Sequence, residues 1–221
     1  MVLKITSWVP DSNRKVTVHF FKKGRINCVS FLFYTPSESG KKTCRKQKTK
    51  GKFHPQFQIK KGLYFMIVKA TEVDGPQIND ITARAGVFNQ EEVDCVRDIF
   101  DEYISLGPDE SGYNFIVDRD GDQIHGFACY GKRDLANGVF DLYWIAVDPN
   151  SRRNGAGRKL IAASEEAVRQ LGGRMLIAET SGTTEYESTR KFYLGVGYEA
   201  EASIKDFYSE GDDLAIFVKR L

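Results

Sequence analysis

The sequence has few of the features that mark secreted, metal-binding or membrane proteins. Its four cysteines are scattered without a Cys-x-x-Cys pair, and its three histidines are also dispersed. We therefore expect free thiols in a reducing cytoplasm and no metal site. No apolar run approaches the roughly 18 residues that a membrane span needs, and the first residues lack the layout of a signal peptide. The sequence thus predicts a cytoplasmic protein without a membrane partner.

Acidic residues are almost absent from the first 70 positions, although the whole chain carries a net charge of only +2. Residues 1–70 hold 16 Lys and Arg against two acidic residues, whereas residues 71–221 hold 16 against 28. Net charges of +14 and −12 indicate two modules of opposite charge. We predict a basic, β-rich N-terminal domain over residues 1–75 and a second domain over residues 76–221.

Apolar runs separated by turn residues predict several strands in the first 70 residues. They are Leu3–Val9, Lys15–Phe21, Arg25–Tyr34, Phe57–Lys60 and Leu63–Lys69. A lysine-rich segment, 41–52, interrupts them and is expected to be a mobile loop. Basic residues among aromatic ones could bind nucleic acid or dock on the acidic domain. We favour the simpler interpretation, a solvated loop on a small β-subdomain.

One stretch of the second domain combines an apolar strand, a glycine-containing turn and a helix. The expected strand is Val139–Val147, and the turn is Asp148–Asn154. Small residues at a helix start let a ligand approach free N–H groups, which favour an anion. The turn therefore predicts a pyrophosphate site. However, the Lys-Ser/Thr pair of a P-loop and the third glycine of a dinucleotide fingerprint are absent.

The elements expected from residue 80 onward follow the order β-α-β-β-β-α-β-α-β-β. Ile81–Arg84 is the expected first strand, and the helix after it begins at a capping box formed by Asn89 and Glu92. A second long helix follows the glycine-containing turn. The other expected elements are Tyr113–Val117, Gln123–Tyr130, Val139–Val147, Arg174–Thr180, the helix Glu185–Leu194, Glu201–Phe207 and Leu214–Lys219.

This order, together with three motifs, resembles the GCN5-related N-acetyltransferase (GNAT) family over residues 80–221. Arg152-x-x-Gly155-x-Gly157 resembles the acyl-CoA loop of that family. Phe192-Tyr193, within 190–198, resembles its Phe-Tyr-x-x-x-Gly-Phe/Tyr segment, and the 113–130 hairpin is also similar. The resemblance implies an α/β (α+β) fold with a mixed central sheet, splayed central strands and flanking helices.

The resemblance also implies an activity, namely transfer of an acetyl group from acetyl-CoA to a primary amine by direct attack. The amine would belong to a small molecule or to a protein. The backbone of Ile145, Ala146 and Val147 is implied to pair with the pantetheine arm. The residues implied to hold the pyrophosphate, mostly through backbone N–H groups, are Arg153, Asn154, Gly155, Ala156, Gly157 and Arg158. The side chains of Arg152, Arg153 and Lys159 could also reach the phosphate groups.

Such a transfer needs an acid for the leaving thiolate and a base for the attacking amine. The resemblance implies Tyr193 as the acid. For the base, the alternatives are Asp141, Glu179 or a water molecule without a dedicated residue. Because side chains alternate along a strand, Asp141 is expected on the same face as Tyr143, Ile145 and Val147.

The acceptor is expected to be an amine, and the acidic second domain suits a cationic one. Residues 206–213 hold four carboxylates and two aromatic rings, which could line such a site, although a solvated turn is the simpler interpretation. The sequence identifies neither the acceptor nor the oligomeric state, for which a homodimer is one option. The alternative functions are a non-catalytic acyl-CoA sensor and an RNA- or ribosome-associated acetyltransferase tethered by the first 70 residues.

Overall fold

Two separate sheets hold the strands in the described part of the chain. The computed structural model describes residues 2–5, 16–22, 25–31, 57–60 and 63–221, with side chains from position 66 onward. Contacts divide the chain into two compact units, Met1–His54 and Pro55–Leu221. The first unit holds an antiparallel sheet of order β1-β2-β3, with strands Val2–Ile5, Val16–Lys22 and Arg25–Phe31. The predicted loop at 41–52 lies outside the described residues.

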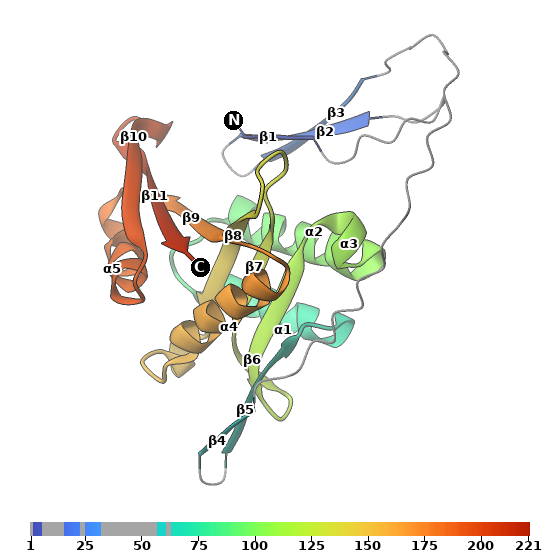
Figure 1. The fold of residues 1–221 in the computed structure, drawn as a ribbon, viewed down its shortest axis with the longest axis vertical. Helices are drawn as coiled ribbons and strands as arrows, with labels where there is room; N and C mark the ends of the chain where they lie inside the picture. The colour runs from blue at the N-terminus through green and yellow to red at the C-terminus, as the bar shows by residue number, and fades with distance from the viewer. Residues whose placement is uncertain (1, 6–15, 23–24, 32–56, 61–62) are drawn as a thin grey trace. The chain divides into compact units, whose positions relative to one another are not determined.

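The second unit is built on an eight-stranded mixed sheet of order β10-β11-β9-β8-β7-β6-β5-β4 (Figure 1). Neighbouring strands are antiparallel except β8 and β9, which are parallel. The predicted mixed sheet is therefore confirmed. The strands are β4 (Phe57–Lys60), β5 (Leu63–Lys69), β6 (Asn114–Asp120), β7 (Gln123–Lys132), β8 (Val139–Val147), β9 (Met175–Ser181), β10 (Glu199–Ser209) and β11 (Asp212–Arg220).

Helices cover both faces of this sheet (Figure 1). On one face, α4 packs Leu160 and Ile161 against Ile116 of β6 and Leu142 of β8. On the other, the ring of Phe100 in α2 meets Phe115 of β6 edge to face, with centroids 5.1 Å apart. No helix in the described part of the chain is long and apolar enough to cross a membrane. The helices are α1 (Gly75–Arg84), α2 (Gln90–Leu106), α3 (Pro108–Ser111), α4 (Ala156–Gln170) and α5 (Glu187–Gly195), with short 3-10 turns η1 (Glu72–Asp74), η2 (Pro149–Ser151) and η3 (Thr184–Tyr186).

The structure corrects the beginning of the predicted element order. Residues 81–84 form the end of helix α1 and not a strand. Pro76 is the second residue of this helix, and Ile78, Ile81 and Thr82 bury one side of it at helical spacing. The strand that opens the order is β5, which pairs with β6. The sequence assigned β4 and β5 to the N-terminal domain, whereas both lie in the second sheet, and the boundary at 75/76 stays a prediction.

The start of α2 and the whole of β8 agree with the sequence. Asn89 Oδ1 accepts the N–H of Glu92, and Glu92 Oε2 accepts the N–H of Asn89, so the predicted capping box is confirmed. Strand β8 has the predicted limits, Val139–Val147. Both features depend on local chemistry, one on two polar side chains three residues apart and the other on an apolar run between turns.

Candidate active site

Strand β8 leads through a tight turn into the N-terminus of α4. Gly155, the residue before the helix, has the left-handed φ of +79°, and Arg153 is also left-handed with φ of +66°. No side chain of the described residues caps this helix end. Its first N–H groups have no intrahelical acceptor, so this turn offers several donors to an anion.

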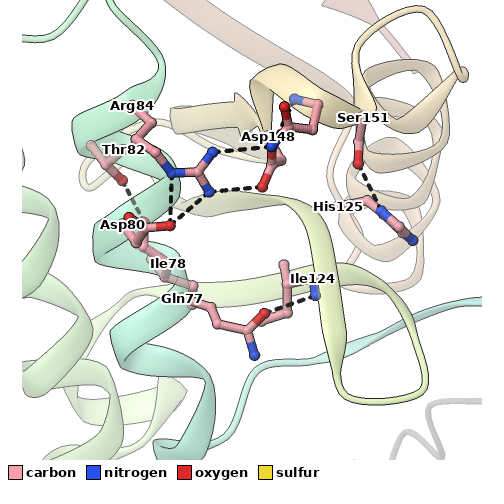
Figure 2. Close-up of polar contacts among 10 residues, drawn as sticks. Gln77, Ile78, Asp80, Thr82, Arg84, Ile124, His125, Asp148 and Ser151 are labelled. Carbon is pink, nitrogen blue, oxygen red and sulfur yellow. Dashed lines mark hydrogen bonds and ion pairs between the residues drawn. The ribbon is translucent and has the colours of Figure 1, made fainter.

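Helix α1 holds this turn in place through its last residues (Figure 2). Arg84 contacts Asp148 at 2.8 Å and also Asp80 at 2.6 Å. The Arg84 guanidinium lowers the pKa of the nearly buried Asp148 carboxyl. Ser151 Oγ lies 2.8 Å from His125 Nδ1 of β7. The turn is therefore braced from two elements before any ligand binds.

Most cationic side chains of the turn already have protein partners. Arg152 Nη2 donates to the carbonyl of Ala85 at 2.6 Å, and Lys159 Nζ lies 3.4 Å from the buried Asp118 carboxylate. Arg158 donates to the carbonyl of Gly195 at 3.3 Å. The exposed Arg153 and Asn154, together with the backbone N–H groups of the turn, are therefore the best placed donors for a pyrophosphate.

Gly157 lies where α4 begins between β8 and α5. A Cβ at this position would stand 3.4 Å from the Phe192 ring and 3.5 Å from Val147 Cγ2. The helix start is thus lined by the end of β8 and by α5, which carries Phe192. The donors and this lining fit a pyrophosphate followed by a slender pantetheine arm.

Strands β8 and β9 separate halfway along their length. Their parallel pairing runs from Val139↔Met175 to Leu142↔Ala178 and ends there. Residues 143–147 of β8 keep β7 on one side only, as the registers Cys129↔Trp144 to Gly126↔Val147 show. Their free backbone edge, which includes Ile145, Ala146 and Val147, can pair with an extended ligand. The predicted splay of the central strands is confirmed.

A bulge at Tyr143 overturns the predicted face of Asp141. The register of β8 on β7 shifts between Tyr130↔Leu142 and Cys129↔Trp144, so Tyr143 is an extra residue. Ile145 consequently shares the α4 face with Leu142, and Asp141 lies on the opposite face. The expected alternation of Asp141 with Ile145 is therefore wrong, because one inserted residue reverses the side-chain pattern beyond it.

The two candidate bases meet at a residue that the sequence reasoning missed, Arg133. Its Nε donates to both oxygens of Asp141 at 2.8 and 3.0 Å, and its Nη2 lies 2.6 Å from Asp141 Oδ1. The same Nη2 donates to Glu179 Oε1 at 2.9 Å. Burial alone would lower the pKa of Arg133, but the two carboxylates raise it, so the guanidinium stays charged. An arginine just after β7 and a carboxylate on the next strand were the only signal available in the sequence.

Tyr193, the candidate acid, lies on the α4 face of the sheet. It is 4% exposed and packs its ring near those of Phe192, Tyr198 and Phe217. Burial raises the pKa of the Tyr193 phenol, so it stays protonated at neutral pH. Glu179 projects from the other face of β9, because Ala178 before it belongs to the α4-side core. The two groups therefore flank β9 where it leaves β8.

Tyr208 and Tyr186 lie on the same side of the sheet as Glu179. Burial and then the negative charges of Glu179, Asp212 and Glu92 raise the pKa of Tyr208. Tyr186 donates its hydroxyl to the carbonyl of Val87 at 2.8 Å, which ties η3 to the α1–α2 connection. Of the predicted acidic turn 206–213, Asp212 accepts a hydrogen bond from Ser181, at 2.6 Å. Within the described residues, no group of three or more His, Cys, Asp or Glu side chains could hold a metal ion.

Comparisons with known proteins agree with this geometry. The model of the acetyltransferase (GNAT) family matches residues 77–198. A GNAT-family structure from Desulfovibrio desulfuricans is 38% identical, with a TM-score of 0.69, and the match covers 71% of this chain and 98% of that one. No curated protein matches the sequence significantly.

Two more distant structures share the fold. The ribosomal-protein-S18-alanine N-acetyltransferase of Escherichia coli is 19% identical, with a TM-score of 0.56 and coverage of 71% of this chain and 93% of that one. The Salmonella typhimurium protein yncA, solved with its cofactor acetyl-CoA, is 17% identical, with a TM-score of 0.56 and coverage of 71% and 94%.

Proposed function

Because this chain belongs to the acetyltransferase (GNAT) family, we propose that it transfers the acetyl group of acetyl-CoA to a primary amine. The observation that carries the proposal is the gap beyond Leu142↔Ala178, which opens beside the uncapped start of α4. A free strand edge then leads through one turn to a cluster of helix N–H groups. The first suits an amide-containing arm and the second a pyrophosphate.

Residues of the turn bind and orient the cosubstrate. The N–H groups after Gly155, with Arg153 and Asn154, hold the pyrophosphate, and the free edge of 145–147 aligns the pantetheine arm. When bound, acetyl-CoA supplies the thioester carbonyl that the amine attacks. Arg152 and Arg84 act indirectly, because they fasten the turn to α1.

Two side chains move protons on either side of β9. Glu179 Oε2, which has no hydrogen-bond partner among the described residues, takes the amine proton directly or through a water molecule. The Tyr193 hydroxyl gives its proton to the departing sulfur, because it is held protonated. Asp141 is the weaker candidate base, since both of its oxygens are bound by Arg133.

We also propose that the acceptor is cationic. Glu179, Glu92 and Asp212 gather on the side of the gap opposite α4, and their charges act together on Tyr208. Arg133 offsets part of this charge, so these residues keep a net negative charge that would attract an ammonium group. The net charge of −12 over residues 71–221 points the same way.

The test is a screen of amines with purified protein and acetyl-CoA. Thiol release and mass spectrometry of the acceptors would follow polyamines, aminoglycosides, lysine peptides and peptides with free N-termini, and neutral amines would serve as the control. Acetylation of a cationic amine that stops with Tyr193→Phe or Glu179→Gln would support the proposal. Tight binding of acetyl-CoA without transfer to any amine would instead support a sensor.

A further inference from the structure

Arg133 is fixed at both its backbone and its guanidinium. Its N–H donates to the carbonyl of Val139 at 2.9 Å, which ties the residue to the start of β8. Its guanidinium also binds the Asp141 carboxylate, through Nε as a hydrogen-bond donor and through Nη2 as an ion pair. A planar guanidinium bound at two nitrogens has a set direction, so little rotational freedom remains for the third contact.

That third contact reaches Glu179 where β9 has lost its neighbour. Ala178 is the last residue of β9 paired with β8, and Glu179 follows it at the opening of the gap. The β8 side of Glu179 therefore lacks a paired strand to restrict its side chain. Arg133 supplies that restriction by binding Oε1 at 2.9 Å. Glu179 is 29% exposed, and Oε2 has no partner among the described residues.

We propose that Arg133 is a positioning residue that directs Glu179 Oε2 toward the acceptor amine, and that Asp141 acts only by holding Arg133. This inference rests on the proposed function, in which Glu179 accepts the amine proton. It assigns different roles to Asp141 and Glu179, the two carboxylates that bind Arg133. Asp141, 14% exposed and bound through both oxygens, is the anchor, and Glu179, bound through one, is the base.

The test is a double-mutant cycle on kcat for the best amine found in the screen. Arg133→Met in the unaltered background should lower kcat about 10- to 100-fold, because a base displaced by about 1 Å loses that much. In the Glu179→Gln background the same substitution should change kcat less than about threefold, because the group that it positions is gone. Arg133→Lys should recover part of the activity, and Asp141→Asn should lower kcat without adding to Arg133→Met.

Two further readouts separate positioning from general damage. The KM for acetyl-CoA should stay within about threefold in all Arg133 variants, since the hydrogen bonds and ion pairs of Arg133 in the described structure go to Val139, Asp141 and Glu179 and not to residues 148–159. Arg97→Met, which removes another arginine that pairs with two carboxylates, on the outer side of α2, is the matched control and should leave kcat unchanged.

The outcomes distinguish this inference from the proposed function. Equal effects of Arg133→Met with and without Glu179, or an unchanged kcat in the single variant, would overturn the positioning role alone. Full activity of Glu179→Gln would remove Glu179 as the base and the role of Arg133 with it. Absence of acetyl transfer by the unaltered protein would overturn the proposed function, and this inference would fall with it.

Discussion

Replacement of Lys159 by Met should show whether this side chain at the start of α4 stabilises the fold or binds the cosubstrate. Lys159 Nζ lies 3.4 Å from Asp118 Oδ2, and the Asp118 side chain is 1% exposed. The other oxygen, Oδ1, is buried without a hydrogen-bond partner in the described structure. The substitution would therefore leave a carboxylate that water cannot reach and that has lost its nearest cation.

The expected loss of stability is about 3 kcal/mol at neutral pH, the lower end of the range of about 3–5 kcal/mol for a broken buried ion pair. We take the lower end because the Lys159 side chain is 34% exposed, so that solvent already screens the pair. For a domain of this size, about 3 kcal/mol corresponds to a fall of about 6–12 °C in the melting temperature. Lys191→Met, which breaks the exposed pair with Glu187, is the control and should cost less than about 1 kcal/mol.

The loss should depend on pH. Burial raises the pKa of Asp118 above its usual value, although Lys159 partly opposes the shift. A raised pKa in the folded state means that the carboxyl favours folding below its unfolded pKa and loses that contribution as the pH rises through the folded value. Without Lys159 the folded pKa rises further, so the penalty grows toward neutral pH and disappears below about pH 4.

Thermal melting from pH 4 to 8 would measure the loss of stability in Lys159→Met, and calorimetric titration would measure its affinity for acetyl-CoA. Asp118→Asn combined with Lys159→Met should recover most of the lost stability. The folded Lys159→Met protein should bind acetyl-CoA within about threefold of the unaltered affinity, because the ammonium faces Asp118. A tenfold weaker affinity without a change in melting temperature would refute this reasoning and make Lys159 a phosphate ligand.

Four other substitutions test the rest of the site. Gly155→Ala should cost about 1–2 kcal/mol in stability, because φ is +79° there, whereas Gly157→Ala should not destabilise the fold; equal melting temperatures would contradict this. Tyr193→Phe should lower kcat about 100-fold and leave the dissociation constant of acetyl-CoA unchanged, and unaltered turnover would exclude the phenol as acid. Arg84→Met should remove the stabilisation that the lowered pKa of Asp148 provides. That stabilisation is present above about pH 4 and is lost as the pH falls through the lowered pKa. The melting temperatures of the unaltered protein and of the Arg84→Met variant should therefore differ at neutral pH and converge in acid.

The sequence predicted those parts of the fold that depend on near neighbours. The limits of β8 follow from an apolar run between turns, and the start of α2 follows from Asn89 and Glu92. The error at 81–84 has a physical cause. Ile and Thr favour strands over so short a segment, but the helical spacing of Ile78, Ile81 and Thr82 buries more apolar surface than an isolated strand would.

The partners of the candidate site residues could not be predicted, because each pair is distant in sequence. Arg152 binds the carbonyl of Ala85, and Lys159 lies beside Asp118. Arg152 lies in the turn before α4 and Lys159 in the first turn of α4. A sequence motif cannot tell a cation that faces a ligand from one that faces its own protein. Only the folded structure, which brings the end of α1 to Arg152 and β6 to Lys159, distinguishes the two.

The bulge at Tyr143 decides on which face of the sheet Asp141 lies. In an unbroken β8, Asp141 would share the α4 face with Ile145, on the Tyr193 side of the sheet. The extra residue places it instead on the face of Glu179, where one arginine can bind both carboxylates. Glu179 and Tyr193 then lie on opposite faces of the sheet. In the transfer that we propose, the amine would enter from the α1–α2 side and Tyr193 would serve the sulfur from the α4 side. The bulge is seen only in the register of β8 on β7, and the β8 sequence alone gave no signal of it.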